Sequence, residues 1–316
     1  QNRGMPYLMA RDKGQMMNNM IEVFDRWISD GNARKDTVKK LFSSFGRIIQ
    51  RDNTAIFDEY EAKYGQRPPR FTTISPTKHC NLRCVGCYAA SSENTNIHMD
   101  FDYVDRIVRE QKELWGSHFV VISGGEPMMY HSKGKNILDL VERHPDVLFL
   151  MYTNGTLITD EAADRMAELG NITPSISVEG FEEETDERRG KGIHKKIREA
   201  FERLHKAGVV YGISVTATNK NADIVLSPEF IDYYMNQLHV YYMWMFQYMP
   251  IGRSYSLDLM VTPQQRKDLL DKMYRWMYDE ELFIADFWNS GTISNGCLSA
   301  GRSGGYVYID WNGDVM

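Results

Sequence analysis

Cysteine is scarce in this sequence, with only four among 316 residues. No apolar run approaches the roughly 18 residues that a membrane-spanning helix needs, and no basic region followed by an apolar stretch marks a secretory signal after Gln1. Acidic residues outnumber basic ones, and the net charge of −6 argues against nucleic-acid binding. These absences exclude a disulfide-stapled secreted scaffold and a membrane protein, so we expect a soluble, cytoplasmic, globular protein.

The pattern of apolar residues changes near residue 70. Residues 8–65 are helix-like, and from Phe71 onward short apolar runs alternate with amphipathic helices. Buried parallel strands read as continuous apolar runs, and six such runs occur, at 71–75, 119–123, 148–152, 172–178, 209–215 and 240–248. We therefore predict the α/β class, with a partial (β/α)6 barrel of parallel strands whose active site lies at the carboxyl ends of the strands.

The remaining chain predicts a shorter C-terminal segment. A helix is expected to begin at Thr262, with Pro263 at its first position and Gln265 completing a capping box. The string "YVYIDWNGDV" predicts a β-hairpin with Asn312 and Gly313 at its turn. The predicted division is a helical N-terminal extension at 1–67, the partial barrel at 68–255, and a C-terminal helix and hairpin at 256–316.

Three of the four cysteines, Cys80, Cys84 and Cys87, stand in the string "CNLRCVGCY" directly after the first predicted strand. Three thiolates at this spacing can each bind a different iron of a cubane cluster and leave the fourth iron open, whereas most iron–sulfur proteins supply four cysteines. A structural zinc site, with His79 or a remote residue as fourth ligand, is the alternative. A disulfide fits less well, because one of the three thiols would stay unpaired.

A second motif, "SGGEP" at 123–127, ends the second predicted strand and so faces the same cleft. Its glycines allow the backbone to approach a ligand closely, and Glu126 offers an acceptor to a cation. Taken alone, the motif is equally consistent with an ordinary turn. Its place one β/α unit after the cysteines favours a shared binding site.

Together the cysteine triplet, the aromatic Tyr88 after it and "GGEP" resemble the radical S-adenosylmethionine (SAM) enzymes over residues 68–255. The resemblance implies that Cys80, Cys84 and Cys87 hold a [4Fe-4S] cluster whose open iron is chelated by SAM. It further implies that the cluster passes an electron to the sulfonium, and that a 5′-deoxyadenosyl radical then abstracts a hydrogen from the substrate. An electron donor of the flavodoxin or ferredoxin type is the implied partner.

The same resemblance assigns further positions to SAM. Gly124, Gly125 and Glu126 would bind its amino group, the Tyr88 backbone would meet the adenine, and Arg189 would bind the carboxylate. The positions implied near the ribose, the adenosine and the cleft are Thr153, Asn154, Ser177, Glu179 and Thr218.

Structural alternatives remain for several of these positions. Thr153, Asn154 and Thr218 are equally consistent with helix caps, and Glu179 with a solvated turn residue. Arg188 is an alternative to Arg189 as the carboxylate ligand. Asn219 is likewise an alternative to Thr218.

The fourth cysteine, Cys297, lies in a tail that resembles the start of a SPASM or twitch extension, in which a cysteine and a hairpin begin a second cluster site. A possible auxiliary cluster at Cys297 would need ligands beyond Met316, and the alternative is a buried free thiol. The tail favours modification of a peptide or protein side chain. A lipid or small-molecule substrate is the rival, and a non-catalytic metal-binding or electron-transfer protein is a third interpretation.

The sixth predicted strand is rich in aromatic and methionine side chains, which suit the dry pocket that a radical reaction needs. Near its carboxyl end, Gln247 or Tyr248 is the expected substrate contact.

Overall fold

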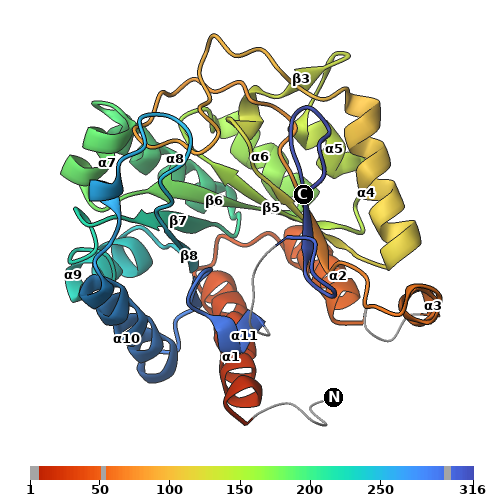
Figure 1. Cartoon of the computed structure of the whole chain (residues 1–316), viewed down its shortest axis with the longest axis horizontal. Helices are drawn as coiled ribbons and strands as arrows, with labels where there is room; N and C mark the ends of the chain where they lie inside the picture. Colours follow the sequence, from red (N-terminus) through yellow and green to blue (C-terminus); the bar gives the residue numbers. More distant parts are fainter. Residues whose placement is uncertain (1–6, 51–54, 295–299) are drawn as a thin grey trace.

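The computed structural model describes residues 7–50, 55–294 and 300–316, without the side chains of Gln50 and Ser294. Its centre is one curled sheet of parallel strands with helices on its outer face (Figure 1). The strands, in chain order, are β1 (Phe71–Ile74), β2 (Phe119–Ile122), β5 (Leu148–Thr153), β6 (Ile172–Val178), β7 (Gly212–Ala217), β8 (Tyr242–Gln247), β9 (Ile284–Asp286) and β10 (Tyr306–Ile309).

The six central strands agree with the six apolar runs of the sequence, and the predicted partial barrel is confirmed. The sheet order is β10-β1-β2-β5-β6-β7-β8-β9, and every neighbouring pair is parallel. The two edge strands, β9 and β10, come from the C-terminal segment and extend the predicted sheet by one strand on each side. β10 also forms the predicted hairpin, since Val315 bridges back to Ile309 in the antiparallel sense.

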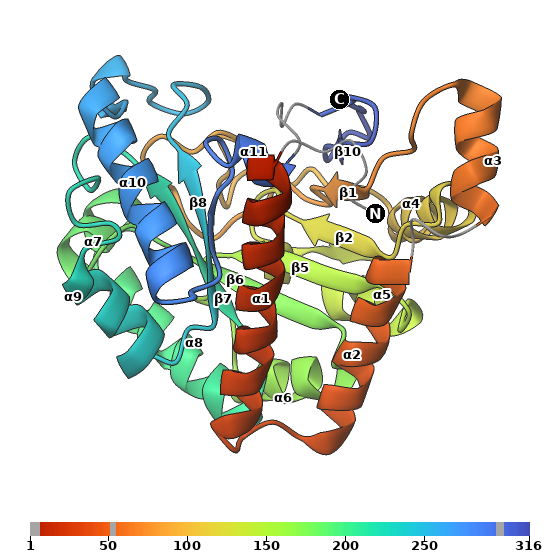
Figure 2. The same cartoon turned by 90° about the horizontal axis from the view of Figure 1, so that it is seen from below.

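Among the described residues, three helices precede the sheet, in the part of the chain that the sequence predicts to be helical. Figure 2 shows the first two side by side across the amino end of the sheet. They are α1 (Tyr7–Ser29), α2 (Lys35–Gln50) and α3 (Ala55–Tyr64). The indole of Trp27 donates to the carbonyl of Gly208 (3.1 Å), and Thr37 donates to the carbonyl of Ala167 (2.6 Å). These bonds attach α1 and α2 to turns at the amino ends of the strands.

The remaining helices follow individual strands and cover the outer face. The longer ones are α4 (Phe101–Trp115), α5 (Ile137–Arg143), α6 (Asp160–Leu169), α7 (Glu182–Arg189), α8 (Ile193–Ala207) and α10 (Pro263–Asp279). The shorter elements are η2 (Pro127–Met129), β3 (His131–Ser132), β4 (Lys135–Asn136), α9 (Pro228–Ile231), η3 (Asp232–Gln237), η4 (Leu257–Leu259) and α11 (Gly291–Ser294). α10 carries the predicted capping box of Thr262 and Gln265. None of the described helices is both long enough and apolar enough to cross a bilayer.

The two faces of the sheet differ in chemistry. The outward face carries fully buried aliphatic side chains such as Ile122, Ile213 and Met245, which pack under the helices. The register of the strands places aromatic and hydroxyl side chains on the concave face, where Tyr152 of β5 and Phe246 of β8 meet with ring centroids 5.5 Å apart across two intervening strands. The side chains of the six central strands on this face include no charged group among the described residues: Phe71, Thr73, Phe119, Val121, Leu148, Leu150, Tyr152, Thr173, Ser175, Ser177, Ser214, Thr216, Tyr242, Trp244 and Phe246.

The two edges of the sheet approach each other through aromatic rings. Phe287, directly after β9, lies 6.1 Å from Tyr306 of β10 and 5.4 Å from Phe246, measured between ring centroids. Tyr306 in turn stacks on Phe71 at 5.2 Å. The curled sheet is thus joined at its edges by rings, while the pairing order leaves β9 and β10 without a shared ladder.

Candidate active site

The three clustered cysteines lie in the loop after β1, at the carboxyl end of the sheet, as the sequence predicts. Cys80 is buried, Cys84 and Cys87 are half-buried, and all three are free thiols. Burial raises the pKa of Cys80 to about 12, and burial also raises the pKa of Cys84 against the opposing charge of Arg189. The thiols of Cys80 and Cys84 are therefore neutral near pH 7, and an incoming metal would replace their protons.

The spacing of the sulfur atoms separates the two metal hypotheses. Ligands of one tetrahedral zinc ion stand about 3.8 Å apart when each Zn–S bond is about 2.3 Å. In the described part of the chain, only one set of three His, Cys, Asp or Glu side chains places its ligand atoms within 4.8 Å of one another, and it contains no cysteine. The three sulfur atoms thus stand farther apart than the ligands of one ion, which favours a larger cluster that takes one cysteine at each of three metals.

The "GGEP" segment follows β2 and packs against the cysteine loop. Gly125 donates its N–H to the carbonyl of Thr77 (2.7 Å), and Glu126 donates to the carbonyl of His79 (2.8 Å). A Cβ atom on Gly125 would stand 2.1 Å from the His79 oxygen, so only glycine permits this approach. In this structure the glycine lets the two loops meet, which fixes the position of Glu126 relative to the cysteines.

The Glu126 side chain is buried and held by three donors. Its Oε1 accepts from the Thr153 hydroxyl (2.7 Å) and from the Met128 N–H (3.0 Å), while Oε2 accepts from the Asn154 N–H (2.8 Å). Burial raises the pKa of Glu126 above its usual value, against the effect of these hydrogen bonds. A cationic ligand beside Glu126 would favour the ionised form.

Thr153 and Asn154, at the end of β5, connect Glu126 to the cysteine loop. The Asn154 amide donates to Asn81 Oδ1 (2.9 Å) and lies 3.9 Å from the sulfur of Cys80. Its Oδ1 accepts from the N–H and the hydroxyl of Thr156. Asn154 therefore bridges the loop after β5 to the segment that carries the first cysteine.

Glu179, at the end of β6, lies between two arginines at the end of α7. Arg189 contacts Glu179 Oε1 at 2.6 Å, and Arg188 contacts Oε2 at 2.6 Å. The carboxylate is buried, which does not fit a solvated turn residue. Burial alone would lower the pKa of Arg189. The attraction of the Glu179 carboxylate outweighs this effect, so the pKa of Arg189 lies above its usual value. Two guanidinium groups share one carboxylate, so this group carries one positive charge in excess.

Arg188 also contacts the cysteine loop. The Arg188 Nε donates to the carbonyl of Val85 (3.1 Å), and the Val85 N–H donates to the carbonyl of Arg188 (2.9 Å). Arg188 thus holds the loop between Cys84 and Cys87, while its guanidinium shares Glu179 with Arg189. The structure brings both candidate arginines to the same carboxylate.

Ser177 and Thr218 lie on the neighbouring strand ends. The Ser177 hydroxyl is 3.1 Å from that of Ser214 on the concave face. Thr218 is bonded through its N–H and hydroxyl to Asn221 Oδ1, and the Asn221 amide donates to the carbonyl of Glu179 (2.7 Å). Asn221 could not be identified from the sequence, because its role depends on β6 and β7 being neighbours.

The loop after β8 covers the cysteine loop, an arrangement that sequence reasoning missed. Gly252 has a positive φ of 78°, and a Cβ there would stand 2.2 Å from the carbonyl oxygen of Cys87. The next residue, Arg253, donates its N–H to the Cys87 carbonyl (2.9 Å) and its guanidinium to the carbonyl of Ser91. The dipeptide Gly-Arg after the last central strand was the available signal.

The remaining candidate positions fall into different environments. Tyr88 is half-exposed, with its hydroxyl 3.0 Å from that of Ser123. Tyr248 is buried against Gly86 of the cysteine loop. Gln247 faces the outer side of β8 and donates to Asp286 (2.8 Å), so the two expected substrate contacts lie on opposite sides of the sheet. Cys297 lies outside the described residues.

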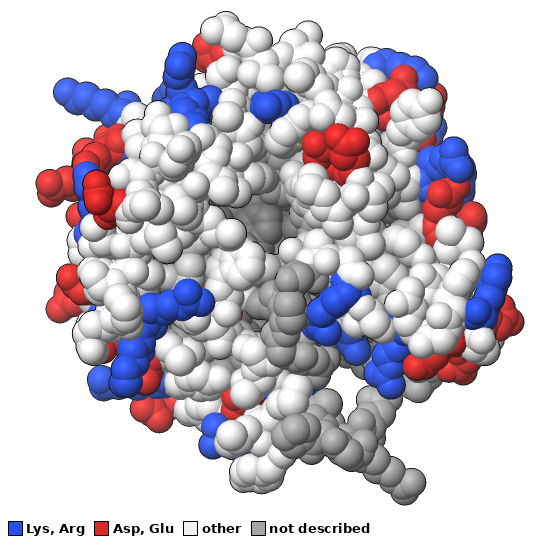
Figure 3. All heavy atoms as spheres, in the orientation of Figure 1, with Lys and Arg blue, Asp and Glu red and all other residues white. Residues whose placement is uncertain are grey.

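The carboxyl-end face is only sparsely charged at its centre. Figure 3 shows a hollow near the middle of the molecule, while Lys, Arg, Asp and Glu gather toward the rim. The neutral centre agrees with the uncharged side chains on the concave face of the sheet. An uncharged cavity beside a charged ligand site is a suitable arrangement for a reaction that must exclude water.

Comparison with known proteins agrees with this geometry. The model of the radical SAM superfamily matches residues 74–223. Among curated proteins, the chain is 29% identical over 153 residues to the Fe-coproporphyrin III synthase of Methanosarcina barkeri, covering 46% of this chain and 36% of that protein. It is 27% identical over 158 residues to the sporulation killing factor maturation protein SkfB of Bacillus subtilis, covering 50% and 38%.

A similar fold occurs in the crystal structure of Streptococcus suis SuiB bound to the precursor peptide SuiA. The TM-score is 0.64 at 17% identity, over 82% of this chain and 61% of that one. The chain thus spans less than two thirds of the length of each of these three proteins.

Proposed function

We propose that this chain is a radical SAM enzyme, in which Cys80, Cys84 and Cys87 hold a [4Fe-4S] cluster and SAM binds beside it. When bound, the cluster supplies the electron that cleaves a carbon–sulfur bond of SAM and yields a 5′-deoxyadenosyl radical. The observation that carries this proposal is the set of three free thiols beside a buried carboxylate and two arginines. The protein's own part is to bind SAM, to orient it and to exclude water.

Different residues around the cysteines are proposed to bind the two charged groups of the methionine part of SAM. Glu126, fixed by three donors, is the proposed partner of the amino group, with Gly124 and Gly125 shaping the approach. Arg189 is the proposed partner of the carboxylate, with Arg188 as the alternative. Because both arginines already contact Glu179, binding of the SAM carboxylate would use the positive charge that this group has in excess.

The nucleoside part of SAM has less charge to recognise. Glu179 and Ser177 are the proposed ribose contacts, and Thr218 and the Tyr88 backbone are the proposed adenosine contacts. Thr153 and Asn154 act through others, because their hydrogen bonds go to Glu126 and the cysteine loop. These two residues are proposed to position the site.

For the substrate we propose a peptide or protein side chain. Support comes from a maturation protein among the relatives and from a fold shared with a peptide-bound structure. The uncharged concave face favours an uncharged group at the point of hydrogen abstraction. Of the two predicted contacts, Gln247 or Tyr248, the proposal keeps Tyr248, because Gln247 faces the outer side of β8. A small-molecule substrate is the second candidate, favoured by the similarity to a tetrapyrrole-forming synthase. The electron donor is proposed to be a flavodoxin or ferredoxin, and an auxiliary cluster at Cys297 remains a proposal.

Anaerobic reconstitution tests the central proposal. With iron, sulfide, dithionite and SAM, we expect a brown protein that releases 5′-deoxyadenosine, measured by liquid chromatography. The Cys84→Ala variant should lose the cluster and at least 100-fold of the cleavage rate, because only two thiolates remain.

The control is Cys297→Ala, which should leave SAM cleavage largely intact. A colourless wild-type protein that binds one zinc per chain and cleaves no SAM would refute the proposed cluster. Equal loss of cleavage in both variants would contradict the separate roles given to the two cysteine positions.

A further inference from the structure

A second group of metal-ligating side chains lies at the opposite end of the sheet from the cysteines. Asp30 follows α1, His205 lies in the last turn of α8, and His239 precedes β8. Figure 2 shows the turn between α1 and α2 at the end of the molecule from which β8 points away. The three side chains come from three separate segments, and nothing in the proposed SAM site uses them.

The spacing of their ligand atoms fits one metal ion. The two histidines and Asp30 each place a nitrogen or oxygen within 4.8 Å of the others. Asp30 Oδ2 lies 3.7 Å from His239 Nδ1, which is too long for a hydrogen bond. Two ligands of a tetrahedral zinc ion stand about 3.4 Å apart when each bond is about 2.1 Å, so this gap is close to the separation across a shared ion.

One histidine also has an unsatisfied ring nitrogen. His205 Nδ1 is buried and has no hydrogen-bond partner, while Nε2 lies 2.9 Å from the Asn32 amide. If the side-chain amide of Asn32 is rotated so that its oxygen and nitrogen exchange places, the oxygen accepts a hydrogen bond from the Nε2–H of His205. The lone pair of Nδ1 is then free to bind a metal ion. Metal-bound histidines commonly show this arrangement, in which the second nitrogen donates to a fixed acceptor.

The surrounding residues prepare the other ligands. Tyr241 donates its hydroxyl to Asp30 Oδ2 (2.5 Å), and Arg26 donates to the Tyr241 carbonyl (2.9 Å). The rings of His205 and His239 stack with centroids 4.1 Å apart and planes 17° from parallel. One ring must therefore rotate for both to face the same ion. The His239 side chain is 44% exposed and has room to rotate.

We propose that Asp30, His205 and His239 bind one divalent transition-metal ion of the zinc type, with water completing the tetrahedron. The ion ties the turn between α1 and α2 to the end of α8 and to the start of β8. Its role is structural, because it adds to the side-chain hydrogen bonds that already join these segments, among them those of Trp27, Arg26 and Tyr241. A metal that joins separate segments stabilises the folded state, and the stabilisation grows with the logarithm of the metal concentration once this exceeds the dissociation constant.

Zinc binding to the iron-loaded protein tests this proposal, since the cysteines are then occupied. Wild type, dialysed against about 10 µM zinc chloride and analysed for metals, should retain one zinc per chain and show a higher melting temperature. His239→Asn should retain less than a tenth of this zinc and lose the thermal shift. Asparagine suits the left-handed backbone at residue 239 (φ 52°), so the variant should fold.

A second variant, His205→Gln, should behave in the same way. The control is His118→Gln, a half-buried histidine outside the group, which should keep the zinc and the thermal shift. Equal zinc retention in wild type and both site variants, or no retention in wild type, would overturn the site. Neither outcome would affect SAM cleavage, so the failure of this proposal is distinguishable from failure of the proposed function.

Discussion

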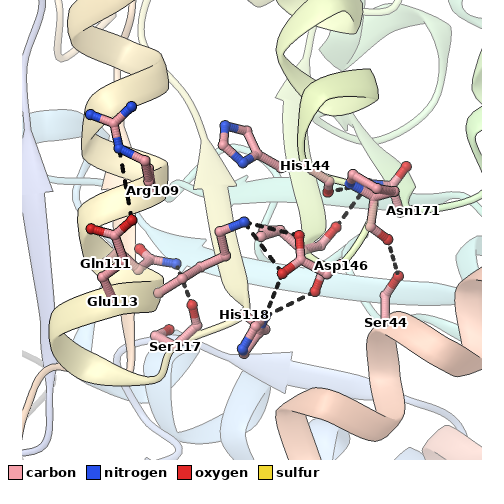
Figure 4. Close-up of polar contacts among 12 residues, drawn as sticks. Ser44, Arg109, Gln111, Glu113, Ser117, His118, His144, Asp146 and Asn171 are labelled. Atoms are coloured by element: carbon pink, nitrogen blue, oxygen red, sulfur yellow. Dashed lines mark hydrogen bonds and ion pairs between the residues drawn. The ribbon is translucent and has the colours of Figure 1, made fainter. Parts of the chain in front are cut away.

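The two ends of the parallel sheet use polar side chains in different ways. At the amino end they complete the hydrogen bonding of the main chain: the Asn171 amide donates to the carbonyls of Val141, His144 and Val147, and Gln111 donates to those of Ser117 and Phe119. Figure 4 shows part of this network.

At the carboxyl end, several polar side chains bond one another. Thr153 holds Glu126, Asn154 reaches Asn81, and two arginines share Glu179. Bonds between side chains can be exchanged for bonds to a ligand without disturbing a strand, whereas bonds to main-chain carbonyls cannot. The first end is therefore built for stability and the second for binding.

The largest expected effect comes from the buried asparagines at the two ends. Asn171→Ala should lower the free energy of unfolding by about 2 kcal/mol, because it removes one donor from each of three carbonyls. Those of Val141 and His144 keep a main-chain donor, whereas that of Val147 is left unsatisfied, at a cost of about 1–3 kcal/mol. Denaturant unfolding measures this change, and SAM cleavage per folded molecule should be unchanged. Asn154→Ala should reverse the pattern, with a smaller loss of stability and about a tenfold slower cleavage. Similar losses of stability and activity in both variants would remove the distinction between the ends.

A matched pair of glycines gives the next largest effect. Gly65, before β1, and Gly252, beside Cys87, both have positive φ angles, 66° and 78°. Gly65→Ala should cost about 1 kcal/mol, the strain of a left-handed residue, because a Cβ there meets no atom within 4 Å. Gly252→Ala adds a clash with the Cys87 carbonyl and should lower the iron retained after reconstitution at least threefold. Full iron retention in Gly252→Ala would show that the close approach of the two loops is dispensable.

The smallest effect concerns pH at the amino end. Burial lowers the pKa of His118, beside Asp146, so protonation is less favourable in the folded state than in the unfolded chain. This stabilisation is present above pH 6.5, the usual value, and is lost as the pH falls through the unfolded pKa toward the lower folded one. His118→Gln should therefore flatten the decline in unfolding free energy between pH 7 and pH 5. An unchanged slope in the variant would show that His118 does not contribute to the pH dependence.

The sequence predicted the central strands and several helices because their signals are local. Buried strands need unbroken apolar runs, and the capping box of α10 is contained in four residues. The edge strands were harder, because β9 has only three residues and β10 was predicted only as part of a hairpin. The position of an edge strand depends on which existing strand still has an unpaired edge. That in turn depends on how all the other strands of the sheet are paired.

The candidate site shows the same limit. The cysteines and Glu126 were predictable, since the order of the strands along the chain places them at one end of the sheet. Asn221 and Gly252 were not, because each acts on a segment more than 40 residues away. The pairing of Glu179 with both arginines was also missed, because the motifs assign each of these residues its own contact with SAM and do not show contacts between them.

The aromatic contact between Phe287 and Tyr306 has a consequence for access to the cavity. Rings join the two margins of the curled sheet, and an aromatic pair contributes only about 1 kcal/mol beyond its buried area. Separating this ring contact costs far less free energy than separating two hydrogen-bonded strands. The two edges of the sheet can therefore move apart and admit a large substrate from the side, while the loops at the carboxyl end stay in place.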